Sequence, residues 1–261
     1  MVSAAGVSLP RQCPLRRNPH LPEAFRAELM KRLLPTLILI SLCGLARAEF
    51  GAAMRAIERG HYATAERALR KPAASGDARS QNNLGYLYEH GMGVPQSYAQ
   101  ALSWYQKASD AGLPEAKYNL ATLYHRGLGV ARSQETALPL FTAAAQAGYA
   151  DAEYMLGEYH RTGLGGVPRD GALALSWFLR AARKGHPGAQ LMAASIYFSG
   201  EGWRAEPQKA LIWAELARIN GEAQAAQLTG RAGKGMRADL QQEALQLANL
   251  CLKTSYKDCP E

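Results

Sequence analysis

The stretch that decides the fold runs over residues 84–108 and reads "LGYLYEHGMGVPQSYAQALSWYQKA". In it, Gly91 and Gly93 bracket a single residue between two segments rich in alanine and aromatic side chains. A glycine pair of this kind has two common uses. It can cradle a phosphate group in an enzyme, or it can end one helix and turn the chain into the next. The number of such pairs in the chain distinguishes these uses.

The glycine pair belongs to a repeat of about 36 residues. The glycines that open each unit are Gly76, Gly112, Gly148, Gly185 and Gly221. Pairs follow 15 and 17 residues later, at Gly91/Gly93, Gly127/Gly129, Gly163/Gly165 and Gly200/Gly202. A phosphate-binding loop opens one helix, with a strand before it or a Lys-Ser/Thr pair in it. Four equivalent loops without these features indicate turns.

Both halves of each unit carry small and apolar residues at helical spacing. In the second half, Ala101, Trp104 and Ala108 stand at i, i+3 and i+7, which is one face of a helix. The Trp104 position recurs as Leu140, Trp177 and Trp213, and we expect it to fill the gap to the neighbouring unit. Each unit is therefore predicted to be two amphipathic helices joined by a glycine turn.

Helix pairs with this period resemble the Sel1-like repeat family, which is related to the tetratricopeptide repeats. The resemblance rests on "LGYLYEHGMGV…ALSWYQKA", "LATLYHRGLGV…ALPLFTAA", "LGEYHRTGLGGV…ALSWFLRAA" and "SIYFSGEG…ALIWAELA". It implies an all-α fold, a right-handed α-solenoid of helix pairs with a C-terminal capping helix.

The regions on either side of the repeats divide the rest of the chain. Residues 49–75 are interpreted as a degenerate leading helix pair, residues 76–221 as four Sel1-like repeats, and residues 222–261 as a C-terminal cap. Within the cap, "RADLQQEALQLANLCLK" predicts the terminal helix with a polar outer face that a solenoid needs. Its apolar positions are Leu240, Ala244, Leu245, Leu247, Leu250 and Leu252.

The N-terminal region predicts export. Lys31 and Arg32 precede an apolar run over residues 33–45, and Ala46-Arg47-Ala48 has the form of a cleavage site. Residues 30–48 therefore read as a signal peptide cleaved after Ala48, which places the mature protein in the periplasm. Residues 1–29 are interpreted as lying upstream of the true start at Met30, outside the mature protein.

Cys251 and Cys259 are the cysteines of the expected mature chain. In an exported protein, two cysteines eight residues apart indicate a disulfide that fastens the cap. Two unpaired thiols are the alternative. A zinc site is not expected, since no histidine lies near them in sequence.

Charge and motifs argue against nucleic acid and catalysis. Residues 1–48 carry seven Lys/Arg and two Glu, so they account for +5 of the formal net charge of +8. The remaining +3 shows no basic stripe that could follow a phosphate backbone. The chain has no H-E-x-x-H, C-x-x-C, G-x-S-x-G, S-x-x-K or P-loop motif. We therefore expect a protein that is not an enzyme, with no cofactor, no metal, no stable membrane insertion and no nucleic-acid partner.

The resemblance implies a monomeric scaffold that binds a partner protein through the concave face of the solenoid. By similarity with tetratricopeptide repeats, that face is formed by the first helix of each unit. The predicted contact residues are Asn82, Tyr86, Glu89, His90, Tyr118, Thr122, His125, Arg126, Tyr154, Glu158, Arg161, Leu191 and Ser195, with Arg79, Glu115 and Asp151 near the starts of these helices. Solvated polar faces are the alternative interpretation of these side chains.

Several roles follow from the same resemblance. Exported Sel1-like proteins include immunity proteins that neutralise antibacterial effectors, such as type VI secreted phospholipases. Others are adaptors in polysaccharide export or envelope signalling. A cell-wall-binding protein is a further alternative. A β-lactamase-like enzyme is disfavoured, because those relatives carry a cysteine pair in every repeat and residues 76–221 contain no cysteine.

Overall fold

The computed structural model describes residues 49–260. The signal peptide and cleavage site predicted over residues 30–48, and residues 1–29 before them, lie outside the described residues. Residues 49–58 are helical. The helices that follow are α2 (Tyr62–Ala74), α3 (Ala78–His90), α4 (Tyr98–Asp110), α5 (Pro114–Arg126), α6 (Gln134–Gln146), α7 (Ala150–Thr162), α8 (Gly171–Ala182), α9 (Pro187–Ser199), α10 (Pro207–Ile219), α11 (Ala225–Gly233) and α12 (Ala238–Lys253), with a short 3₁₀ turn η1 (Leu164–Gly166) after α7.

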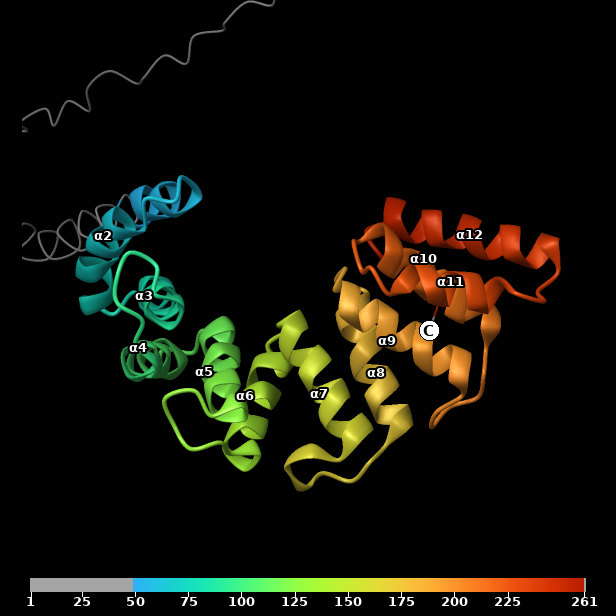
Figure 1. Ribbon diagram of the computed structural model, residues 1–261, viewed down its shortest axis with the longest axis horizontal. Helices are drawn as coiled ribbons and strands as arrows, with labels where there is room; N and C mark the ends of the chain where they lie inside the picture. Colours follow the sequence, from blue (N-terminus) through green and yellow to red (C-terminus); the bar gives the residue numbers. More distant parts are fainter. Residues whose placement is uncertain (1–48, 261) are drawn as a thin grey trace, which may run out of the picture. The chain divides into compact units, whose positions relative to one another are not determined.

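The helices stack in chain order. The most extensive contacts join α3 to α4, α5 to α6, α7 to α8, and α9 to α10, which we call repeats 1 to 4. Each pair also packs on the pair before it (Figure 1). This arrangement confirms the predicted all-α solenoid. Among the described residues, none of the helices has the length and apolar character needed to span a bilayer.

The turns have the local chemistry that the repeat predicts. Gly91, Gly127, Gly163 and Gly200 are left-handed C-caps of the first helices, a conformation that costs glycine little. The side chains of Ser97, Ser133 and Asp170 then accept backbone N–H bonds at the starts of α4, α6 and α8.

The second glycine of each loop does more than reverse the chain. Gly93 has a φ of +71°, and a Cβ there would overlap the backbone of Tyr62 and Ala63 at the start of α2. Gly129 stands equally close to Tyr98 at the start of α4. The loop of one repeat therefore rests on the second helix of the pair before it, and only glycine permits this approach.

The position that fills the core lies one residue after the predicted one. Tyr105, Phe141 and Phe178 are fully buried on the second helices. The predicted residues Trp104 and Trp177 are only half-buried, with Lys107 and Arg180 over their rings at 4.2 and 4.4 Å. The predicted position does pack toward the neighbouring unit, since Trp104 and Leu140 each contact the buried groups of two adjacent units. It is not the fully buried position, because i+3 and i+4 from the same alanine both lie near one helix face and the packing buries i+4 more deeply.

The buried rings occupy hollows made by missing side chains. A Cβ on Gly85 would lie 2.6 Å from the ring of Tyr105, and a Cβ on Gly157 would lie 2.5 Å from the ring of Phe178. Repeat 4 is different, since Ala194 and Ala214 hold the equivalent positions and both are buried. On its second helix α10, the fully buried aromatic residue is Trp213, at the predicted position.

The cap packs through small residues. Helix α12 lies against α10 and buries Ala244, Ala248 and Cys251. Leu240, Leu245 and Leu250 are exposed, so part of the apolar set of this helix faces outward. Cys251 and Cys259 face each other with Cα atoms 5.0 Å apart, a separation that a disulfide spans. The predicted disulfide is compatible with this geometry.

Candidate protein-interaction surface

The first helices α3, α5, α7 and α9 carry the predicted contact residues, but these side chains differ in what they can offer a partner. The most accessible are Tyr86, His90 and Arg126. Tyr86 is 43% exposed, and its ring lies 4.1 Å from that of His90 one turn later. His90 Nδ1 also lies 3.0 Å from the Tyr86 carbonyl oxygen. Arg79 and Glu115, near the starts of α3 and α5, are exposed as well.

Asn82 does not face solvent as predicted. Its side chain is 3% exposed, and its Oδ1 accepts a hydrogen bond of 2.9 Å from Asn119 Nδ2. The two amides join α3 to α5 across the boundary between repeats 1 and 2. Asn82 was predicted to contact a partner because it is polar. Its side chain is instead buried and hydrogen-bonded, so it holds two repeats together.

Tyr118 and His125 belong to an aromatic group between repeats 2 and 3. The Tyr118 ring lies 5.6 Å from Phe141 and 5.2 Å from Tyr149. His125 Nδ1 lies 3.0 Å from the Tyr159 hydroxyl. Burial, with smaller contributions from Arg132 and Arg126, lowers the pKa of His125, and burial raises the pKa of Tyr159 to about 12. The ring nitrogen of a neutral imidazole can accept a hydrogen bond from the Tyr159 hydroxyl. Tyr118 and His125 are therefore both engaged in packing between the repeats.

Tyr154 is held by a histidine that the sequence did not single out. Its ring stacks on His186 with centroids 4.8 Å apart and planes 15° apart. His186 Nδ1 accepts the backbone N–H of Ala189 and so caps α9, while Nε2 lies 3.1 Å from Asp151 Oδ1. The hydrogen bond from His186 lowers the pKa of Asp151 and outweighs the opposing effect of burial. The place of His186 directly before Pro187 was the available signal for a helix cap.

The remaining polar residues on these helices have local partners. Arg161 donates to both oxygens of Glu158 at 3.1 and 2.8 Å, and this contact raises the pKa of Arg161. Glu89 accepts from the Tyr105 hydroxyl at 2.7 Å. Thr122 Oγ1 donates to the backbone carbonyl of Tyr118. Glu89, Glu158 and Arg161 remain partly accessible, with fixed orientations.

The C-terminal end of this surface is hollowed. Leu191 and Ser195 line a cavity of about 230 Å³ between α9 and α11. The other lining residues are Met192, Gln224, Gln227, Leu228 and Arg231. Arg231 lies over the ring of Phe198 at 4.7 Å. The residues from α11 were missed, because the repeat period ends before that helix. Over residues 49–260, no group of three or more His, Cys, Asp or Glu side chains is arranged to hold a metal ion.

The fold and this surface define a repeat solenoid whose first helices present mixed aromatic and charged side chains. The sequence model of the Sel1 repeat matches residues 78–113, 114–149, 150–186 and 187–221, which is more than half of the chain. The chain therefore belongs to the Sel1 repeat family. A comparison with curated proteins gave no match.

Solved structures show the same fold. A Sel1 repeat protein from Oxalobacter formigenes is 29% identical, with a TM-score of 0.67 over 77% of this chain and 84% of that one. A protective antigen of uropathogenic Escherichia coli is 28% identical, with a TM-score of 0.73 over 83% of this chain and 48% of that one. An immunity protein from Pseudomonas aeruginosa is 20% identical, with a TM-score of 0.50 over 83% of this chain and 84% of that one. At that identity, the last likeness shows a shared fold.

Sel1 repeat proteins are generally scaffolds for protein–protein interaction and not enzymes. This chain has the architecture for that role, because its helix pairs present a continuous series of first helices.

Proposed function

We propose that this protein is an exported, monomeric scaffold that binds one partner protein through the surface of α3, α5, α7 and α9. The proposal rests on one observation about these helices: some of their polar side chains join neighbouring helices, and others remain exposed to solvent. Asn82 and His125 join neighbouring helices, whereas Tyr86, His90 and Arg126 lie outside the packing. Aromatic and Arg side chains on a rigid frame are the residues that contribute most to protein–protein binding.

The cellular role we propose is immunity, in which the scaffold neutralises an antibacterial effector in the periplasm. The signal-peptide pattern over residues 30–48 supports export, and a scaffold alone is sufficient for neutralisation. An envelope adaptor would use the same surface on a resident partner. The two roles differ in whether loss of the protein exposes the cell to a toxin.

The test begins with capture of the partner from an envelope extract by the tagged, full-length chain, followed by affinity measurements on variants. Tyr86→Ala should weaken binding about thirtyfold, the equivalent of roughly 2 kcal/mol for a well-packed aromatic contact. The matched control is Trp203→Ala, because Trp203 is 44% exposed and Tyr86 is 43% exposed, and Trp203 lies in the loop after α9. Equal effects of the two changes would count against this surface.

Charge reversal gives a second, independent comparison. Arg126→Glu on α5 should weaken partner binding, and Arg67→Glu on α2 should not, although both arginines are exposed. Both variants should keep their helical circular dichroism and melting temperature. For immunity, a strain that makes Arg126→Glu should lose protection against the captured effector. Full protection by this variant would reject immunity through this surface. N-terminal sequencing that finds Glu49 first would support export.

A further inference from the structure

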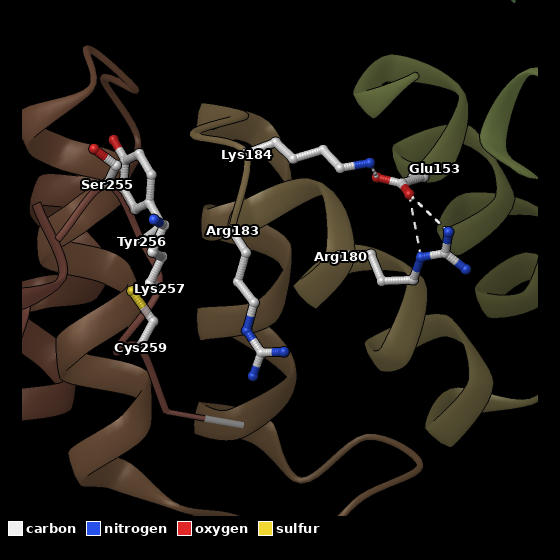
Figure 2. A pocket seen from close by; sticks show the side chains of 8 residues that line it. All are labelled: Glu153, Arg180, Arg183, Lys184, Ser255, Tyr256, Lys257 and Cys259. Carbon is white, nitrogen blue, oxygen red and sulfur yellow. Dashed lines mark hydrogen bonds and ion pairs between the residues drawn. The ribbon is translucent and has the colours of Figure 1, made fainter. Parts of the chain in front are cut away.

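A second feature lies away from the predicted contact residues, where α8 ends beside the C-terminal loop. A pocket of about 510 Å³ opens there (Figure 2). Its lining residues are Glu153, Arg180, Arg183, Lys184, Ser255, Tyr256, Lys257 and Cys259. Four of these side chains are cationic, and Glu153 is the one acid among them.

The single acid is hidden beneath the cations. The Glu153 side chain is 0% exposed, whereas those of Arg180 and Lys184 are 49% and 39% exposed. Arg180 donates to Glu153 Oε1 at 3.1 Å and Lys184 donates to Oε2 at 2.7 Å, so both carboxylate oxygens are occupied from the pocket side. Figure 2 shows both cations converging on Glu153. Arg180 and Lys184 are therefore held in fixed orientations, and their remaining N–H groups can donate to a molecule that enters the pocket.

The other repeats show that the scaffold does not need these charges. Gln190 of repeat 4 stands at the position of Glu153, and Asn220 stands at the position of Lys184. Asn220 Nδ2 donates to Gln190 Oε1 at 2.8 Å, which is the neutral counterpart of the Lys184–Glu153 contact. Gln81 of repeat 1 also holds the Glu153 position. Amide side chains are sufficient to join the helices of one repeat to the next. The charged side chains of repeat 3 therefore need another explanation.

Charged side chains also replace amides in the contacts with the backbone carbonyl groups at the helix ends. Gln81 and Gln190 each donate to the carbonyl eight residues earlier, Ala73 and Ala182. In repeat 3 the equivalent carbonyl is that of Ala145, which Arg180 Nη2 approaches at 3.5 Å. Lys184 Nζ donates to the Gly148 carbonyl at 2.8 Å. Cations have thus taken over contacts that neutral side chains make elsewhere, and they bring surplus positive charge to one site.

The other wall of the pocket is a loop in an uncommon conformation. Ser255 and Tyr256 have φ values of 50° and 65°, in the left-handed region that residues other than glycine rarely adopt. The Tyr256 hydroxyl exchanges hydrogen bonds with Asn220 at 2.8 and 3.1 Å, and Cys259 faces Cys251 of α12. These contacts hold the loop against α10 and α12, and the Tyr256 ring lies beside Gly185, three residues after the end of α8. Backbone strain that is held by its surroundings is typical of functional sites.

We propose that this pocket binds a compact multivalent anion, either a phosphate group or the clustered carboxylates of a small acidic molecule. Arg180 and Arg183 line the pocket with planar guanidinium groups, a shape that suits carboxylate and phosphate oxygens, and Lys184 and Lys257 add point charges. Asp258 follows Lys257 in the loop but does not line the pocket. The surplus positive charge favours an anion with at least two negative charges.

The test is calorimetric titration of the full-length chain with inorganic phosphate and, separately, with citrate, at constant ionic strength in chloride buffer. We expect saturable one-site binding of at least one of the two anions. Phosphate alone would assign the site to phosphate groups, and citrate alone would assign it to clustered carboxylates. No saturable binding of either anion would overturn the proposal.

A matched pair of double variants separates this site from general charge attraction. Arg183→Gln with Lys257→Gln removes two pocket cations, and the expected affinity loss is at least tenfold. Arg67→Gln with Lys234→Gln removes the same net charge at exposed positions outside the pocket, and its affinity should stay within twofold of the parent. Equal losses in the two double variants would show attraction to net charge and reject the site.

The pair Glu153→Gln with Lys184→Asn copies the amides of repeat 4 into repeat 3. This variant keeps a hydrogen-bonded pair between α7 and the end of α8, so its melting temperature should stay near that of the parent. It should still lose anion affinity, because Lys184 is gone and Arg180 has lost its charged anchor. Unchanged anion binding in this folded variant would also contradict the proposal.

Discussion

Repeats 3 and 4 build the same helix pair with different side chains. In repeat 3 the ring of Phe178 lies over Gly157, where a Cβ would come within 2.5 Å of it. In repeat 4, Ala194 and Ala214 take these places, and Trp213 is buried one position earlier on α10. Helix α10 also packs against α11 and α12, and Trp213 belongs to the same buried cluster as Leu228 and Ala244 of those helices. The size of the buried aromatic side chain in each repeat thus depends on which helices pack against that repeat.

The largest effect that follows from this comparison concerns the buried ring. Phe178→Ala should destabilise the protein by about 3–5 kcal/mol, because Phe178 is fully buried and its removal leaves a cavity. Trp177→Ala next to it should cost about 1–2 kcal/mol, since Trp177 is half-buried and loses mainly surface packing and its contact with Arg180. Urea unfolding of both variants measures the difference. A greater loss for Trp177→Ala would restore the position predicted from sequence.

A smaller effect is expected at the glycine that receives the ring. Gly157→Ala should destabilise by about 1–3 kcal/mol, because its Cβ would push against Phe178. The matched control is Gly230→Ala in α11, where a Cβ meets no atom within 4 Å. That change should be neutral or stabilise the helix by up to about 1 kcal/mol. Two variants of similar stability would mean that α7 and α8 can separate to accommodate a methyl group.

The smallest effect concerns the contact that joins the two repeats. Hydrogen bonding to His186 lowers the folded-state pKa of Asp151 below its unfolded value of about 3.9. The ionised form therefore stabilises the fold at neutral pH, and this contribution is lost as the pH falls from about 5 through the lowered pKa. Asp151→Asn should cost about 1 kcal/mol or less at pH 7, because the carboxylate is partly exposed. It should also flatten the acid limb of the stability curve, which chemical denaturation at pH 3 to 7 would show. An unchanged loss of stability between about pH 5 and pH 3 in this variant would show that protonation of Asp151 does not contribute to it.

The fold could be predicted from the sequence because its turns require glycine. Gly91 and Gly127 adopt positive φ, which favours glycine. Each turn can therefore be recognised in the sequence by a glycine that recurs at a fixed interval. The buried ring was misplaced by one residue, since Trp104 and Tyr105 lie on neighbouring parts of one helix face. The period of 3.6 residues gives the direction of a face only coarsely.

The candidate surface was less predictable than the fold. Residue type and repeat position placed Tyr86 and Arg126 in solvent, and they placed Asn82 there as well. The bond from Asn119 to Asn82 crosses between repeats, and so does the stacking of Tyr154 on His186. Contacts between residues more than 30 positions apart depend on how one helix pair sits on the next. A single sequence does not specify that arrangement residue by residue.

The close approach of Gly93 to the start of α2 and of Gly129 to the start of α4 has a consequence for how such a protein can change over generations. These contacts of glycine with the backbone and Cβ atoms of the preceding helix help to fix the interval from one repeat to the next. Residues that face outward, such as Tyr86 and Arg126, can be exchanged one at a time without altering that interval. The surface of these first helices can therefore diverge while the repeat architecture is inherited intact.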